Sequence, residues 1–79
     1  MTDDELVRWV QDWTPPAEPF WLYGENGHVL VTDPALFAAV VRADLTGPAP
    51  AGTKRNQPRA AALRVARRLW EMFGPDAGA

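Results

Sequence analysis

The sequence predicts one small α+β domain with the element order α-β-β-α-α, in which a two-stranded antiparallel hairpin packs against the helices. Three observations predict it. Three segments carry helix start and stop signals around an apolar periodicity, one Asn-Gly pair separates two strand-like runs, and 79 residues suffice for a single domain. We expect this domain to span residues 1–75 and residues 76–79 to form a disordered tail.

The first helix is expected at about residues 3–13. Thr2 and Glu5 have the spacing of a capping box, in which each side chain bonds the backbone N–H of the other residue. A single apolar stripe follows at positions i, i+3, i+4 and i+7: Leu6, Trp9, Val10 and Trp13. Pro15 biases the residue before it away from helical geometry, so the helix should end there.

Two strand-like runs, 20–23 and 28–31, predict the hairpin. Asn26-Gly27 is the expected turn, because a type I′ turn needs positive φ at both central residues. The facing pairs are then Glu25 with His28, Tyr23 with Leu30, and Leu22 with Val31. The apolar face, which should meet the core, carries Phe20, Leu22, Val29 and Val31. Trp21 and Tyr23 lie on the other face, which is aromatic with polar edges.

Two more helices should follow. Asp33 and Pro34 suit the N-cap and first position of one helix, and Gly47 ends it. After a long loop over 46–57, another helix should open near Asn56–Pro58 and run to Phe73. The predicted core comprises Leu6, Trp9, Val10, Trp13, Phe20, Leu22, Val29, Val31, Leu36, Phe37, Val40, Leu63, Ala66, Leu69, Trp70 and Phe73.

Composition excludes several classes of protein. The chain has no Cys, no Ser and one His, which rules out disulfides, Ser or Cys nucleophiles and an ordinary zinc site. No apolar run approaches the ~20 residues that span a bilayer, and the acidic start is unlike the basic opening of a signal peptide. We therefore expect a cytoplasmic protein without membrane contact, either a monomer or a homodimer.

Catalysis is not expected from these residues. His28 and Glu25 form the one plausible acid/base pair, but the sequence shows no third group to orient them. Asp3, Asp4 and Glu5 better fit helix capping than a cation site, because consecutive helical residues point in different directions. No nucleotide-binding or metalloprotease motif is present. The prediction is a protein that is not an enzyme and has no cofactor and no metal.

The charge is divided along the chain, and the division suggests the binding surface. Residues 1–33 net −6 and residues 34–79 net +4. The expected partner-binding residues are the basic ones near and on the last helix: Lys54, Arg55, Arg59, Arg64, Arg67 and Arg68. Arginines beside a helix N-terminus suit phosphate. The alternative is a solvated helix face trimmed by Arg67–Glu71 and Arg68–Glu71 pairs.

Two further surfaces are secondary candidates. Asp3 and Asp4 belong to an acidic surface that would fit a basic groove on a partner, in imitation of nucleic acid; the alternative is capping and solubility. Trp21 and Tyr23 would form a protein-binding patch, since aromatic residues are enriched at interface hot spots. The alternative is that a helix covers them.

A compact, charge-divided domain without catalytic motifs resembles the small inhibitors encoded by phages and mobile elements, anti-CRISPR proteins among them. The resemblance is one of class, so no residue roles are carried over. It implies a protein that inhibits or regulates a nucleic-acid-handling protein or ribonucleoprotein complex by protein contact. The alternative is direct DNA or RNA binding through the basic loop and last helix. The usage of 13 Ala and 7 Arg against one Lys suggests a GC-rich bacterium or its phage.

Overall fold

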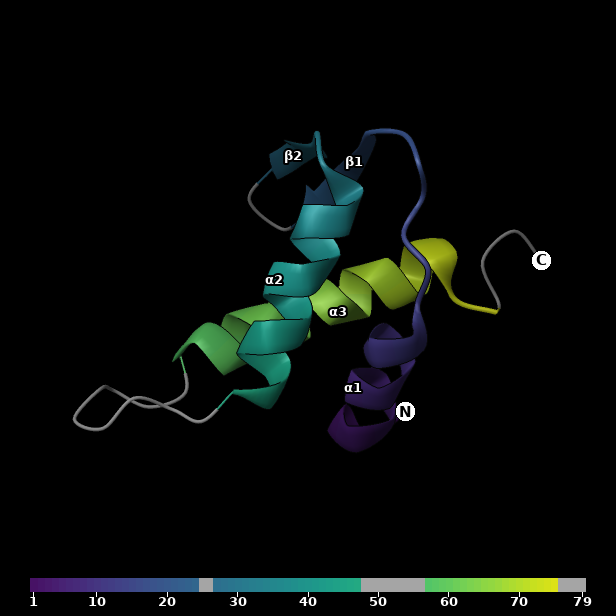
Figure 1. Ribbon diagram of the computed structural model, residues 1–79. Helices are drawn as coiled ribbons and strands as arrows, with labels where there is room; N and C mark the ends of the chain where they lie inside the picture. The colour runs from purple at the N-terminus through teal and green to yellow at the C-terminus, as the bar shows by residue number, and fades with distance from the viewer. Residues whose placement is uncertain (25–26, 48–56, 76–79) are drawn as a thin grey trace.

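The computed structural model describes residues 1–24, 27–47 and 57–75, and it confirms the predicted fold class and element order. The elements are α1 (Asp3–Asp12), β1 (Phe20–Gly24), β2 (Gly27–Val31), α2 (Pro34–Thr46) and α3 (Gln57–Phe73). The three helices pack on one another, and the antiparallel hairpin packs on them (Figure 1). The predicted tail, residues 76–79, lies outside the described residues.

The capping box at the start of α1 forms as predicted. The Thr2 hydroxyl accepts a hydrogen bond from the backbone N–H of Glu5 (3.2 Å), and the Thr2 backbone N–H donates to Oε1 of Glu5 (3.3 Å). Leu6 and Val10 are fully buried, as their place in the apolar stripe requires. Trp13 is the C-cap in an extended conformation, so the helix ends one residue earlier than expected.

The hairpin pairs in a register that differs from the predicted one. The facing pairs are Phe20 with Val31, Trp21 with Leu30, Leu22 with Val29, Tyr23 with His28, and Gly24 with Gly27. The expected pairs of Glu25 with His28 and of Tyr23 with Leu30 are therefore wrong. Gly27 does have the predicted positive φ, 129°, but it is the first residue of β2 and pairs across the hairpin instead of forming the centre of the turn.

The register error leaves the assignment of faces intact. Leu22 was expected opposite Val31 and lies opposite Val29, which is a shift of two residues. Because side chains alternate between faces with a period of two, such a shift moves no side chain to the other face. Leu22 and Val31 are buried on the inner face, and Trp21 and Tyr23 are exposed on the outer face, as predicted.

α2 begins as predicted but buries a different side. The Asp33 carboxylate accepts a hydrogen bond from the Leu36 backbone N–H (3.1 Å), and Pro34 occupies the first turn. The buried residues are Pro34, Ala38, Val41 and Leu45. Leu36 and Val40 were expected in the core and are exposed. Each lies two positions, or about 200° of helical rotation, from Ala38, which places both on the opposite side of the helix.

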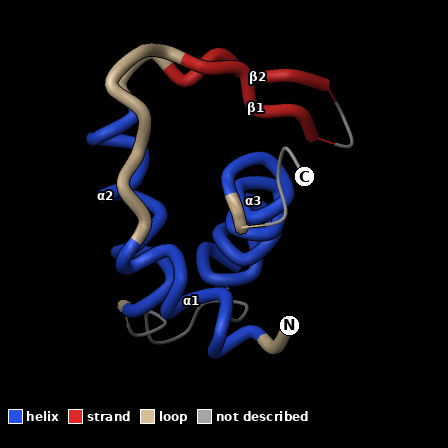
Figure 2. The backbone as a smooth tube through the Cα atoms, turned by 90° about the vertical axis from the view of Figure 1, so that its right-hand side faces the viewer, coloured by secondary structure: helices blue, strands red, loops and turns tan. Residues whose placement is uncertain are grey.

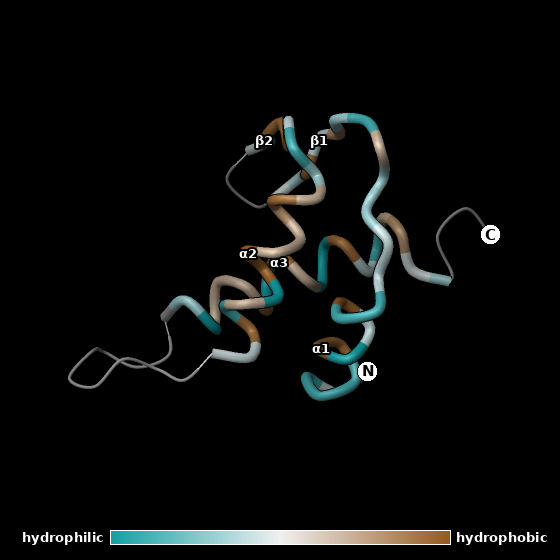
Figure 3. Tube along the Cα trace, in the orientation of Figure 1, coloured by the Kyte–Doolittle hydropathy of each residue, from teal (hydrophilic) through white to brown (hydrophobic). Residues whose placement is uncertain are grey.

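The core consists of two buried clusters that meet at aromatic residues. One is built on Leu6, Val10, Val41, Leu45, Ala62 and Ala66, and the other on Trp13, Leu22, Val31, Ala38 and Leu69. Trp9 packs against both, and its ring meets that of Trp70 edge-on at 5.1 Å. Figure 3 shows hydrophobic and hydrophilic residues alternating along α1 and α3, as this one-sided burial requires, whereas most of α2 is coloured as hydrophobic.

Val29 was also expected in the core and is exposed. In Figure 2, β1 lies between α3 and β2, and the contacts of the hairpin with the helices come chiefly from β1. Val31 at the base is buried, whereas Val29, nearer the tip, is 62% exposed. The hairpin therefore overhangs α3 at its tip.

Two arginines satisfy the carbonyl oxygens at helix C-termini. Arg42 of α2 donates from Nε to the Val10 carbonyl oxygen (2.9 Å) and from its terminal nitrogen to that of Trp13. Arg59 of α3 donates to the Leu45 carbonyl oxygen near the end of α2. The last carbonyls of a helix have no partner within the helix, so a cation in this place supplies hydrogen bonds and complements the helix dipole.

Candidate functional site

The candidate site begins with the arginine face of α3, which we define as Arg64, Arg67 and Arg68. α3 buries Ala62, Ala66 and Leu69 at positions i, i+4 and i+7. The helical period turns the three arginines away from that stripe, as the sequence predicts. Their side chains reach solvent, with relative exposures of 53% for Arg67 and 38% for Arg68.

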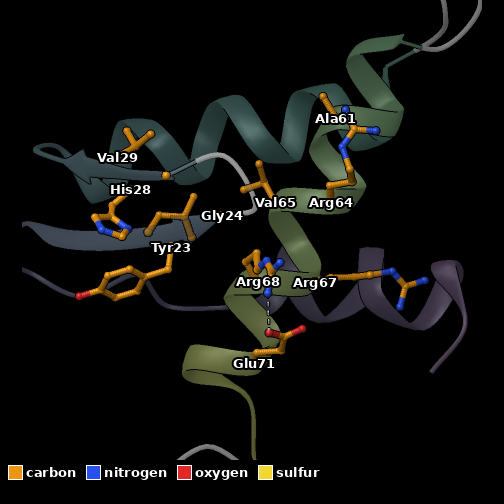
Figure 4. A pocket seen from close by; sticks show the side chains of 12 residues that line it. Tyr23, Gly24, His28, Val29, Ala61, Arg64, Val65, Arg67, Arg68 and Glu71 are labelled. Atoms are coloured by element: carbon orange, nitrogen blue, oxygen red, sulfur yellow. Dashed lines mark hydrogen bonds and ion pairs between the residues drawn. The ribbon is translucent and has the colours of Figure 1, made fainter.

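The three guanidinium groups diverge instead of forming one cluster. Arg67 extends toward α1 and pairs with Asp3 at 3.0 Å, and Arg68 pairs with Glu71 at 3.2 Å. Arg64 runs along α3 toward Ala61 (Figure 4) and has no carboxylate partner among the described residues. Of the two ion pairs expected on a solvated helix face, Arg68–Glu71 forms, whereas Arg67 pairs with Asp3 of α1 instead of Glu71.

The other predicted basic residues have separate positions. Arg59 is half-buried and donates to the Leu45 carbonyl oxygen, so its guanidinium serves the end of α2 and does not join the arginine face. Lys54 and Arg55 lie outside the described residues. Asp3 and Asp4 are exposed in the first turn of α1, and the pairing of Asp3 with Arg67 joins the acidic and basic surfaces at one point.

The outer face of the hairpin carries three aromatic rings in contact. The Tyr23 ring meets that of His28 edge-on, with centroids 4.9 Å apart, and the centroid of the Trp21 ring lies 6.4 Å from that of His28, also edge-on. Trp21 is 50% exposed and Tyr23 is 54% exposed. No described helix covers this face fully, so Trp21 and Tyr23 are available to a partner.

A groove of about 570 Å³ lies between the tip half of the hairpin and α3, and we call it the hairpin groove. Its apolar lining includes Leu22, Val29 and Val65, and its polar lining includes Arg64, Arg68 and Glu71. Figure 4 shows Val29 projecting from the hairpin and Val65, Arg64, Arg68 and Glu71 from α3, which is distant from the hairpin in sequence. Such a lining accommodates a ligand with an apolar group beside an anionic one, because the aliphatic side chains can bury the apolar group while the neighbouring guanidinium groups bind the anion.

His28 lines the groove but is not placed as a general base. Its ring lies against Tyr23 and Trp21, and no carboxylate among the described residues bonds to it. A general base needs a group that orients it. Glu25, the partner expected from the sequence, lies outside the described residues. No group of three or more potential metal ligands occurs in the described parts of the chain.

Two features of this region were missed by the sequence reasoning. Val29 was expected in the core and no site role was predicted for Val65; Val29 lines the hairpin groove, and Val65 both packs against the core and lines the groove. Arg42 was not singled out, because no local pattern marks an arginine whose partners are 29 and 32 residues away. One signal was present: Arg42 follows the buried Val41, at the border of the apolar stripe of α2.

Comparison with known proteins finds no matching family, no similar curated protein and no similar solved structure. Among the helices of the described residues, none combines the length and the apolar character needed to cross a bilayer.

Proposed function

We propose that this protein is a non-catalytic binding protein that inhibits or regulates a nucleic-acid-handling complex by protein–protein contact, in an anti-CRISPR-like manner. The observation that supports this most directly is the lining of the hairpin groove. Val65 offers apolar contact there, with Tyr23 at the edge and Arg64 and Arg68 alongside. Aromatic and arginine side chains around an apolar centre are the residues that dominate the free energy of protein–protein binding.

Protein contact is favoured over direct binding of nucleic acid by the ion pairs of α3. Arg67 and Arg68 already have carboxylate partners, so a phosphate would have to displace Asp3 or Glu71 to gain their charge. Affinity for free nucleic acid comes mainly from cations that neutralise phosphates. A protein surface, by contrast, also gains from the exposed aromatic and aliphatic groups of the hairpin.

The acidic start of α1 supports the choice of a nucleic-acid-handling partner. Asp3, Asp4 and Glu5 are all exposed in the first turn of α1. A protein that handles nucleic acid has a basic surface for phosphates. Exposed carboxylates of α1 suit such a surface, and they lie next to the arginine face through the Asp3–Arg67 pair.

Direct DNA or RNA binding is the second candidate. Two observations support direct binding: Arg64, Arg67 and Arg68 all project from the same side of α3, and Tyr23 is about half exposed. Aromatic rings beside a cationic groove are typical of surfaces that stack the bases of single strands. This candidate requires an affinity for free oligonucleotides that falls steeply as salt rises.

One capture experiment separates the two candidates. The wild-type protein, Arg64→Glu and the matched charge reversal Arg8→Glu on α1 are used as baits in nuclease-treated lysate of the cells that carry the gene. We expect the wild type and Arg8→Glu to retain a nucleic-acid-handling complex and Arg64→Glu to lose it. Salt-sensitive binding of free oligonucleotides by the wild type, with no complex captured after nuclease treatment, would favour the second candidate. If the wild type neither captures a complex nor binds oligonucleotides, both candidates are rejected.

A further inference from the structure

The outer edge of β2 has no neighbour among the described elements. β1 separates β2 from α3 (Figure 2), and β2 packs chiefly on β1. Residues 27–30 are all exposed, including Val29 at 62% and Leu30 at 43%. Every second residue of an edge strand directs its N–H and C=O away from the sheet, so this edge offers backbone hydrogen-bonding groups to another strand.

The sequence of this edge lacks the usual protections against strand pairing. β2 is Gly-His-Val-Leu-Val and contains no proline, lysine or carboxylate. Edge strands that must stay unpaired commonly carry lysine, proline or an inward-pointing charge. A two-stranded sheet is also marginally stable by itself, and additional strands stabilise it.

We propose that β2 pairs antiparallel with β2 of a second copy of this chain about a two-fold axis at Val29, giving a four-stranded sheet β1-β2-β2-β1. Facing residues in an antiparallel pair direct their side chains to the same face of the sheet. Because side chains alternate along each β2 and both copies have the same sequence, a residue can face only a partner residue whose number differs from its own by an even number. Centring on Val29 is the register that pairs all five residues. Val29 then faces Val29 of the partner subunit, His28 faces Leu30 of the partner subunit, and Gly27 faces Val31 of the partner subunit.

The strand is self-complementary in this register, which is why a second copy is the expected occupant. The two valines on the axis cover each other, and their exposure in the single chain is thereby explained. No like charges face each other, because β2 contains no lysine, arginine or carboxylate, and His28 faces leucine. A symmetric pair of charges on the axis would oppose pairing, and the sequence avoids it.

The pairing also places two hairpin grooves together. A two-fold axis perpendicular to the sheet keeps each face on its own side, so both α3 helices lie on the same side of the four-stranded sheet. The groove of each chain remains lined by its own Leu22, Val65 and Arg64. A dimer of this form presents two equivalent grooves to one partner, and linked sites bind with greater total affinity than either alone.

Sedimentation velocity tests the proposal through the mass in solution. We expect the wild type at millimolar concentration to have twice the 8.7 kDa mass of one chain. Val29→Lys places two ammonium groups on the axis and should give the monomer mass. Leu36→Lys is the matched control, because Leu36 of α2 is exposed to 61%, nearly the same as Val29, and should remain dimeric.

A charge-complementation experiment identifies the axis. Val29→Lys and Val29→Glu should each be monomeric and should form a 1:1 dimer when mixed, since the two side chains then attract each other across the axis. The proposal is overturned by a monomeric wild type, by a dimer that Val29→Lys leaves intact, by loss of the dimer in Leu36→Lys, or by folded Lys and Glu variants that do not associate. Circular dichroism of each variant verifies folding.

Discussion

The guanidinium of Arg42 donates a hydrogen bond to the Val10 carbonyl oxygen, 2.9 Å away, and so ties the middle of α2 to the end of α1. The same side chain also donates to the Trp13 carbonyl oxygen, the C-cap of α1. The direction of α1 relative to α2 is therefore fixed by hydrogen bonds as well as by the apolar contacts of Val10 and Val41. A second arginine, Arg59, does the same between α3 and the end of α2.

Replacing Arg42 by methionine should destabilise the fold. Methionine keeps much of the apolar stem of the side chain but removes the donors to the Val10 and Trp13 carbonyl oxygens; the Val10 oxygen then keeps only the bond from the Trp13 backbone N–H. Hydrogen bonds from a charged donor contribute roughly 1.5–3 kcal/mol, so we expect a loss of about 2 kcal/mol in the free energy of unfolding. Urea denaturation of Arg42→Met against the exposed-site control Arg8→Met measures it; equal midpoints for the two variants would contradict the capping role.

The two glycines that face each other at the hairpin tip should respond differently to alanine. Gly27 has φ 129°, a conformation that residues with a Cβ rarely adopt, although a Cβ there would meet no atom within 4 Å. Gly24 has no such restriction, and its Cβ would lie 3.5 Å from the Gly27 carbonyl oxygen, an ordinary contact.

We therefore expect Gly27→Ala to lower the free energy of unfolding by roughly 1–3 kcal/mol through backbone strain. Gly24→Ala should change it by less than about 0.5 kcal/mol, as surface substitutions usually do. Thermal or urea unfolding of both variants, followed by the tryptophan signal, provides the comparison. An equal loss in both variants would mean that the hairpin tip is sensitive to side-chain volume and not to φ.

The capping box should make the stability of α1 depend on pH. Hydrogen bonds from the Thr2 backbone N–H and then from the Thr2 hydroxyl hold the pKa of Glu5 below its ordinary value of 4.5. The ionised carboxylate is the form that accepts these bonds. Its contribution to stability is therefore complete above the ordinary pKa and is lost as pH falls through the lowered pKa of the folded state.

Glu5→Gln tests this pH dependence. Glutamine retains an acceptor for the capping box but has no charge to titrate. Wild type should be more stable than Glu5→Gln at neutral pH, and the difference should shrink as pH falls below 4.5. An NMR titration of the Glu5 carboxyl gives the pKa directly. A pKa at or above the ordinary value would show that Thr2 does not favour the ionised form.

The features that could be predicted from the sequence depend on residues close together in the chain. The Thr2–Glu5 capping box and the Asp33 N-cap involve residues three positions apart, and their chemistry requires no knowledge of tertiary packing. The hairpin faces were predicted correctly because a two-residue error in register preserves alternation. The register itself was wrong because Gly27 was assigned to the turn, whereas its positive φ occurs within a strand pair.

The features that were missed depend on contacts between distant segments. α2 is apolar on more than one side, so its sequence does not show that Ala38, and not Leu36 or Val40, faces the other helices. The arginine face of α3 was predicted from the helical period. The sequence did not predict that these arginines pair with different carboxylates, because Asp3, the partner of Arg67, is 64 residues away from it in the chain. Packing of α1 on α3 brings these two residues together.

Reversing the arginine face should separate stability from binding. Arg67 and Arg68 take part in ion pairs that are largely exposed to solvent, and exposed pairs contribute about 0–1 kcal/mol. Arg64→Glu, Arg67→Glu and Arg68→Glu together should therefore leave the domain folded. We expect a small decrease in the free energy of unfolding, part of which comes from Arg67→Glu, because this substitution places a second carboxylate beside that of Asp3.

Binding, in contrast, should be abolished in the triple variant. Three reversals remove the guanidinium groups from one side of the hairpin groove and place carboxylates there, which repel the phosphates or the acidic part of a partner's surface that would face these arginines. Urea denaturation measures the stability, and capture from nuclease-treated lysate measures the binding, with Arg8→Glu as the control for charge. A folded triple variant that still captures the same partner would reject the arginine face. The acidic and aromatic surfaces would then be tested by Asp3→Lys with Asp4→Lys, and by Tyr23→Ala, because these exposed residues are the remaining candidates for partner binding.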